Sequence, residues 1–180
     1  FGDTVEEIPA YLFYVSDSGY RPNVTSITIG ENVTCIDNSA FYGCSSLEKI
    51  NIPNDVTNVG KHVFYACDSL NEIIVSSNNS VYDSRNNCNA IIETTTNTLI
   101  CACQNTTIPD SVTSIGNSAF WNCKALTSVI IPDSVTSIGD SAFSSCESLT
   151  SITIPDSVTS IGDSAFWNCK ALTSVIIPDS

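Results

Sequence analysis

Nine cysteines and a single histidine, His62, have the most obvious chemistry in this chain, because thiols and imidazoles bind metals and act as nucleophiles or bases. Five of the cysteines share a sequence context, since each follows a phenylalanine by three residues: Cys44, Cys67, Cys123, Cys146 and Cys169. A cysteine that recurs beside a fixed apolar neighbour behaves as a small buried hydrophobe. We predict that these five pack in the interior, with parallel Cβ directions that do not suit disulfides.

The other four cysteines are Cys35, Cys88, Cys101 and Cys103. A disulfide among Cys88, Cys101 and Cys103 is one alternative for them. A zinc site is disfavoured, because the sequence has no Cys-x-x-Cys pair and no histidine partner for one. We therefore expect neither a metal nor a cofactor.

The sequence contains no nucleophile motif for which His62 could act as the base. The sequence contains no Gly-x-Ser-x-Gly and no glycine-rich phosphate loop, and its 6 basic residues are scattered. We predict that His62 is an exposed residue of a short helix and that the chain carries no catalytic residue. A hydrolytic enzyme built on the irregular part of the chain is a remote alternative, which would require a cleft with converging titratable groups.

Acidic residues dominate the charge, since 19 aspartates and glutamates against 6 basic residues give a formal charge of −13. This charge repels nucleic-acid phosphates and anionic lipid, and the apolar runs are too short to cross a bilayer. Several aspartates recur in register: Asp110, Asp133, Asp156 and Asp179 after a proline, and Asp140 and Asp163 after a glycine. We interpret them as solvated turn and cap residues, with a calcium ion bridging two coils as the alternative.

The spacing of these residues follows an internal repeat. Ile-Pro occurs at residues 52, 108, 131, 154 and 177, and the last four copies are 23 residues apart. The predicted units are therefore 1–28, 29–51, 52–74, 75–107, 108–130, 131–153 and 154–176, with a stub at 177–180. We call 75–107, which carries ten extra residues, the irregular unit. We expect a single domain that is part of a longer array.

Each unit has three predicted parts. Val175 and Ile177 flank Ile176 with the alternation of a short strand that buries one face. Residues 158–161 form a second extended piece, which Gly162 ends. Asp163 is then a helix N-cap, and the spacing of 165, 166 and 169 predicts a short helix. One unit cannot bury enough apolar surface to fold alone, so the units must stack as a parallel solenoid.

A pattern runs from Leu149-x-x-Ile152-x-Ile154 into Val158-x-x-Ile161-Gly162-x-x-Ala165-Phe166-x-x-Cys169. It closely resembles the BspA-like class of leucine-rich repeats: the first part matches the strand signature and the second the continuation that marks this class. The resemblance covers essentially the whole chain. The resemblance implies an α/β right-handed superhelix, with a parallel sheet on one face and short helices or turns on the other. It also implies a side hairpin in the irregular unit, for which we predict strands over 90–93 and 98–101.

The same resemblance implies a secreted or cell-surface protein, commonly bacterial, that binds proteins such as host or extracellular-matrix components in adhesion. It brings no catalytic residues. Our first hypothesis is therefore a non-catalytic protein-binding module, and the alternative is a spacer that presents another domain. The sequence leaves the oligomeric state open.

Two surfaces are candidates for the partner. The first is the outward face of the predicted sheet, made by Lys49, Asn51, Glu72, Ile74, Asn105, Thr107, Ser128, Ile130, Ser151, Thr153, Ser174 and Ile176. It has none of the Trp, Tyr or Arg side chains that dominate binding hot spots. The second is a column of aromatic residues, each of which follows the inner phenylalanine position: Tyr14, Tyr42, Tyr65, Trp121 and Trp167, with Ser144 interrupting it.

Overall fold

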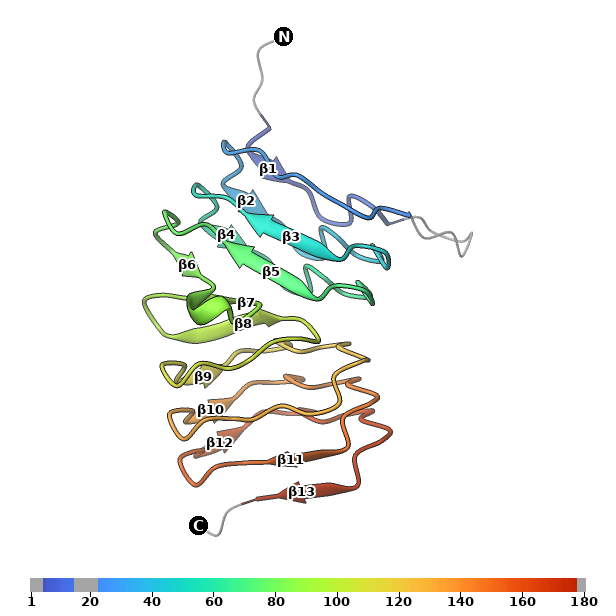
Figure 1. Ribbon diagram of the computed structural model, residues 1–180, viewed down its shortest axis with the longest axis vertical. Helices are drawn as coiled ribbons and strands as arrows, with labels where there is room; N and C mark the ends of the chain where they lie inside the picture. Colours follow the sequence, from blue (N-terminus) through green and yellow to red (C-terminus); the bar gives the residue numbers. More distant parts are fainter. Residues whose placement is uncertain (1–4, 15–22, 178–180) are drawn as a thin grey trace.

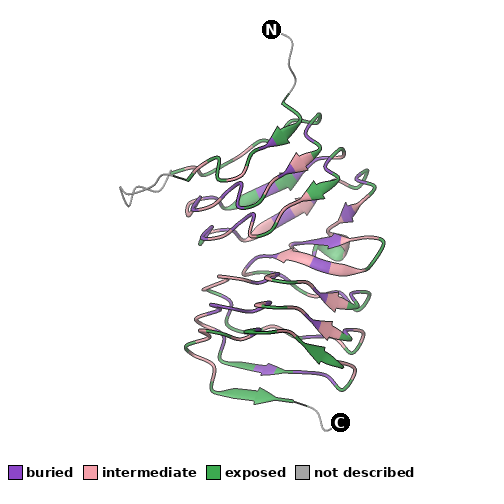
Figure 2. Cartoon of the chain, turned by 180° about the vertical axis from the view of Figure 1, so that it is seen from behind, coloured by how far each residue is buried: buried purple, intermediate pink, exposed green. Residues whose placement is uncertain are grey.

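The protein forms a solenoid whose coils stack along one axis (Figure 1). A computed structural model describes residues 5–14 and 23–177. The strands are short, and they pair mostly in parallel with the equivalent strand of the next coil. Residues of β3, β5 and β11 alternate between buried and more exposed. Buried residues recur in successive coils along the solenoid (Figure 2).

One wall contains the strands expected from the leucine-rich signature. Strand β3 (Lys49–Ile52) pairs with β5 (Glu72–Val75), and β11 (Ser151–Thr153) pairs with β13 (Ser174–Ile176). Both pairs join residues 23 positions apart, such as Lys49 with Glu72. An isolated bridge from Ser26 to Lys49 extends the first pair by one coil. This wall thus consists of two separate two-stranded sheets, whereas the sequence predicted one broad ladder.

The other wall contains the second extended piece of each unit. Near the N-terminus β1 (Glu7–Ile8), β2 (Cys35–Ile36) and β4 (Asn58–Val59) form a three-stranded parallel sheet. Later in the chain three strands with the sequence Ser-Ile pair in parallel, namely β9 (Ser114–Ile115), β10 (Ser137–Ile138) and β12 (Ser160–Ile161).

The irregular unit joins this second wall through a hairpin. Strands β7 (Ala90–Glu93) and β8 (Thr98–Ala102) are antiparallel, so the predicted hairpin is confirmed. Strand β8 then pairs in parallel with β9, while β6 (Tyr82–Asp83) adds to the far side of β7. The result is a six-stranded sheet in the order β12-β10-β9-β8-β7-β6. Strand β6 was not predicted.

The predicted helices do not form, so the α/β assignment is wrong. Among the described residues the one helical element is the three-residue 3₁₀ turn Arg85–Asn87. In residues 117–123 and their equivalents the backbone makes consecutive turns instead, with positive φ at Ser118 (58°) and Asn122 (64°). A left-handed residue of this kind ends a right-handed helix. The protein is a β-solenoid of the leucine-rich-repeat type.

Hydrogen bonds between coils explain why turns replace the helix. The amides of Ser118, Phe120 and Asn122 donate to carbonyls of the next coil, at 2.7–2.9 Å. The alternate amides close four-residue β-turns, as the Trp121 amide does by donating to the Ser118 carbonyl at 3.0 Å. An α-helix would direct these amides along its own axis, and the bonds between coils would be lost.

Side chains at the repeat position of the predicted N-cap Asp163 act between coils. Asn117 Oδ1 accepts the amide of Asp140, and Asp140 Oδ1 accepts the amide of Asp163, both at 2.9 Å. Asn38 accepts the amide of Lys61 in the same way at 2.7 Å. The amide of Lys61 is thus bonded as in the other coils, but the Lys61 side chain has no acceptor for the amide of a following coil. The polar column is therefore a ladder that links successive coils.

The glycine before this ladder is required by close contact between coils. A Cβ atom built on Gly139 would lie 2.6 Å from the amide nitrogen of Asn117 and 2.8 Å from the carbonyl carbon of Gly116. We expect Gly139→Ala to lower the free energy of unfolding by about 1–3 kcal/mol, because rigid backbone must move to admit the methyl group. Urea unfolding measures the loss. The matched control is Gly30→Ala, which meets no atom within 4 Å and should lose much less.

The interior is organised by stacked phenylalanines. Phe143 lies between Phe120 and Phe166, at ring-centre distances of 4.8 and 5.4 Å, and Phe41 stacks on Phe64 at 5.6 Å. These contacts confirm that like side chains of successive units align. The irregular unit has no phenylalanine, and the buried apolar residues fall into two clusters that meet within it.

Candidate functional site: an aromatic ladder and a cavity at the irregular unit

The predicted sheet face points outward but is not continuous. All twelve of its residues are exposed or partly exposed, and Lys49 forms an ion pair with Glu72 at 3.1 Å. Eight of them lie in β3, β5, β11 and β13, whereas Asn105, Thr107, Ser128 and Ile130 lie outside any strand. Ile130 is 86% exposed, the highest value among the large apolar side chains described. This face carries small polar side chains with isolated isoleucines.

The aromatic column forms a ladder of touching rings. Tyr14 contacts Tyr42 at a centroid distance of 5.3 Å, Tyr42 stacks on Tyr65 at 5.0 Å, and Tyr65 meets Trp121 edge-on at 4.9 Å. Tyr11 adds to it, with centroids 5.8 and 6.1 Å from Tyr14 and Tyr42. We call Tyr11, Tyr14, Tyr42, Tyr65 and Trp121 the aromatic ladder. Tyr11 was missed because it stands outside the repeat position.

The ladder continues across the irregular unit, although that unit contributes no ring to it. Tyr65 and Trp121 are 56 residues apart in the sequence, and their rings are nevertheless in contact. Trp167 is not part of this ladder. Ser144, which is only 3% exposed, occupies the intervening position, and Trp167 is 63% exposed.

The repeated cysteines are packing residues, as predicted. Three of the five donate to a backbone carbonyl of the preceding coil: Cys67 to Phe41 at 3.2 Å, Cys146 to Phe120 at 3.2 Å and Cys169 to Phe143 at 3.1 Å. Burial raises the pKa of Cys44 to about 11 and that of Cys146 to about 12, so the thiols stay protonated. All nine cysteines are free, including Cys88, Cys101 and Cys103.

His62 is half-buried in a turn, which corrects the prediction of an exposed helical residue. Its Nε2 lies 3.1 Å from Ser118 Oγ, and its ring meets Trp121 edge-on at 4.1 Å. Ser118 has the positive φ shared by Ser141 and Ser164, so its backbone conformation belongs to the repeat. Within the described residues no carboxylate hydrogen-bonds His62 to complete a hydrolytic triad. The pair joins two coils across the irregular unit.

Protonation of His62 should weaken this junction. Burial, and to a lesser extent the Lys61 cation, lowers the pKa of His62 below its ordinary value of 6.5. The unfolded chain therefore binds a proton at higher pH than the folded chain does. We expect a contribution to stability that is full above pH 6.5 and is lost as the pH falls through the lower folded pKa. Urea unfolding of wild type and His62→Gln between pH 7.5 and 5 tests this. The same change of unfolding free energy with pH in the two proteins would contradict this prediction.

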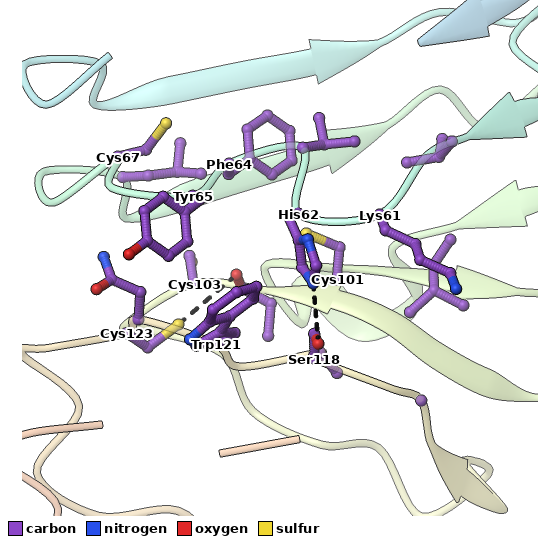
Figure 3. Close-up of a pocket in the computed structure, with 18 of the residues that line it drawn as sticks. Lys61, His62, Phe64, Tyr65, Cys67, Cys101, Cys103, Ser118, Trp121 and Cys123 are labelled. Carbon is purple, nitrogen blue, oxygen red and sulfur yellow. Dashed lines mark hydrogen bonds between the residues drawn. The ribbon is translucent and has the colours of Figure 1, made fainter. Parts of the chain in front are cut away.

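A cavity of about 270 Å³ lies at the same junction (Figure 3). The rings of His62, Tyr65 and Trp121 border it on one side. Apolar and thiol groups form part of its other walls: Phe64, Leu70, Ile100, Ala102, Ala119, Cys67, Cys101, Cys103 and Cys123. Polar side chains, among them Gln104, Asn117 and Asn122, form the rest. Lys124 spans the gap to Asp68 at 3.2 Å. The cavity was not predicted.

The aspartates that follow a proline lie in exposed turns. Asp110, Asp133 and Asp156 are exposed there, and Asp179 lies outside the described residues. Over residues 5–14 and 23–177 there is no group of three or more His, Cys, Asp or Glu side chains arranged to hold a metal ion.

In the same part of the chain no helix has the length and apolar character needed to cross a membrane.

Comparison with known proteins identifies the repeat. The profile of the "BspA type Leucine rich repeat region" matches residues 6–101 and 91–180, in six copies. No curated protein matches the chain. A leucine-rich repeat protein of Eubacterium ventriosum is similar in structure, with 27% identity, a TM-score of 0.66, and coverage of 81% of this chain and 46% of its own.

Two further solved structures are similar. A leucine rich cell surface protein of Faecalibacterium prausnitzii has 26% identity and a TM-score of 0.57, over 85% of this chain and 53% of its own. The pneumococcal vaccine antigen PcpA shares the fold at 20% identity and a TM-score of 0.67, over 94% of this chain and 49% of its own. This chain thus spans about half the length of these proteins. The repeat sequence, the coil geometry and the family profile agree, and the chain belongs to the BspA-type leucine-rich repeat family.

Proposed function

We propose that the chain is a non-catalytic protein-binding module of a bacterial surface or secreted protein, and that its partner binds at the aromatic ladder. Leucine-rich repeat proteins are generally protein-interaction modules. One of the similar structures is named as a cell surface protein. The observation that carries the proposal is the ladder itself, a line of rings that reaches solvent over successive coils.

The aromatic ladder is better suited than the sheet face to bind a partner. Aromatic side chains give large contact area at low entropic cost, and they are enriched in binding hot spots. Tyr11 and Tyr14 are each 52% exposed, so their rings are available to a partner. Because neighbouring rings already hold one another in place, little further ordering is required on binding. The formal charge of −13 favours a partner with a basic surface.

The spacer alternative rests on the sheet face. Its small polar side chains offer few anchors, as expected for a structure that only separates two domains. The two functions differ in what the ladder does. A spacer needs the rings only as cover for the turns, whereas a binding module needs them accessible.

The experiment compares two double variants of the whole chain in quantitative capture from host-cell surface and matrix extracts. Tyr14→Ser with Tyr42→Ser disrupts the ladder, and Ile130→Ser with Ile176→Ser alters the sheet face by a similar apolar area. We expect at least tenfold weaker capture of the same partner by the ladder variant and unchanged capture by the other. Thermal melting confirms that both are folded. Equal capture by wild type and the ladder variant would overturn the proposal.

A further inference from the structure

The irregular unit lacks one rung of the phenylalanine column. In the regular coils the amide of the inner phenylalanine donates to the residue before the next phenylalanine, as Phe120 does to Ala142 at 2.7 Å and Phe41 to Val63 at 3.0 Å. At the irregular unit the amide of Ala102 makes this bond, to Ala119 at 2.9 Å. Ala102 therefore occupies the place of a phenylalanine.

The cysteine contacts give the same correspondence. Cys146 Sγ contacts the carbonyl of Phe120 at 3.2 Å, and Cys123 Sγ contacts the carbonyl of Ala102 at 3.9 Å. The chain is also shorter here. The amide of Gly116 donates to Leu99 as the amide of Gly139 donates to Ile115, so Leu99 has the same place in its coil as Ile115. Ala102 follows Leu99 by three residues, whereas Phe120 follows Ile115 by five. A whole phenyl ring and two residues are thus missing between two regular coils.

The cavity lies where this rung is missing. Phe64 and Ala102 both line it, and its volume is about 270 Å³. An apolar protein cavity of about 150 Å³ binds benzene, so this one has room for more than a single ring. It is slightly smaller than the lower limit of about 300 Å³ for pockets that hold drug-sized ligands. The size therefore indicates a ligand of two fused rings.

The lining selects for an uncharged ligand. The cavity is lined by apolar side chains and thiols together with uncharged polar groups such as Gln104 and Asn122, and burial keeps the thiols neutral by raising the pKa of Cys101 to about 12. The charged side chains that line the cavity, Lys61, Asp68, Glu93 and Lys124, all reach solvent. In the described part of the chain every buried side-chain nitrogen and oxygen has a partner. A charged ligand would therefore find no unpaired buried polar group to bind it. The ring edges of Tyr65 and Trp121 can pack against an aromatic ligand.

We propose that the cavity between units 52–74 and 108–130 binds a small, neutral, bicyclic aromatic molecule, whose rings replace the missing phenylalanine rung. This site is separate from a partner at the exposed end of the ladder. The bound molecule joins the two apolar clusters that meet in the irregular unit. Bound ligand therefore stabilises the junction, because it binds the folded chain alone.

The test uses indole as the probe and the whole chain as the protein. Saturation-transfer NMR measures binding, and thermal melting measures stabilisation. We expect saturable binding of indole to wild type with a raised melting temperature, and at least tenfold weaker binding to Ala102→Phe, which restores the missing ring. The control is Ala125→Phe, which adds the same ring at an exposed position and should bind indole like wild type. Tyr14→Ser with Tyr42→Ser should also retain indole, because neither residue lines the cavity.

Cys101→Phe fills the cavity from the irregular unit and decides the question if Ala102→Phe does not fold. The proposal is overturned if wild type shows no saturation transfer up to the solubility limit of indole. It is also overturned if a folded cavity-filling variant binds indole as wild type does. Binding of N-acetyltryptophanamide without binding of indole would instead assign the cavity to a side chain of a partner protein.

Discussion

Replacing Phe143 with alanine is expected to lower the free energy of unfolding by about 3–5 kcal/mol. Phe143 is fully buried, and its ring stacks between Phe120 at 4.8 Å and Phe166 at 5.4 Å. The substitution removes the ring and leaves a gap that the stacked neighbours cannot close, because hydrogen bonds between coils fix their backbones. Urea unfolding followed by circular dichroism measures the loss.

Two further variants separate burial from aromatic character. Phe166→Ala should lose less, because Phe166 is only partly buried, and Trp167→Ala should lose little, because its ring is 63% exposed. A loss below about 1 kcal/mol for Phe143→Ala would mean that the phenylalanine column does not support the fold, since a buried Phe→Ala change ordinarily costs about 3–5 kcal/mol.

The features that follow the repeat were predictable from the sequence. A side chain that recurs every 23 residues, such as Phe143 or Cys146, must occupy equivalent positions in successive coils. The columns, the buried thiols and the outward direction of Ser151 and Thr153 follow from that alone. The hairpin was predictable from the two short apolar runs of the irregular unit and from the family resemblance.

The helix was mispredicted because local spacing cannot distinguish two conformations. Ala165, Phe166 and Cys169 fit one face of a helix, and they equally fit a series of turns with left-handed residues at Ser164 and Asn168. Bonds to the neighbouring coil decide between them, as when Phe143 donates to Ala165 at 2.8 Å. Such contacts appear only when the units are stacked, so tertiary structure overrides local preference.

The cavity and the His62 contact were unpredictable for a related reason. Both depend on how the irregular unit is aligned with its neighbours, and that alignment brings His62 to Ser118, 56 residues away in the sequence. One signal was available, because the irregular unit has no phenylalanine, and a column of rings must break there. The sequence did not show whether other side chains would fill the gap.

Removing the whole unit 131–153 is expected to leave a folded, shorter solenoid. Units 108–130 and 154–176 differ only at Asn117 and Asp163, so the deletion joins Ile130 to Ile154 and recreates the natural sequence at the junction. Phe120 would then stack on Phe166, and Asn117 would accept the amide of Asp163 as it now accepts that of Asp140. Because each coil contacts mainly its neighbours, the other coils keep their structure.

Circular dichroism and urea unfolding test the deletion. We expect the β spectrum to be retained, and we expect the slope of the unfolding free energy against urea concentration to fall in proportion to the surface removed. The control deletes 131–152, one residue fewer. That change shifts the following strands by one position and exchanges their buried and exposed faces. We expect the C-terminal coils to unfold in the control and not in the 23-residue deletion. Loss of all β structure in the 23-residue deletion would contradict a stack of equivalent coils. If both deletion variants stay fully folded, the register of the buried columns is not what holds the coils together.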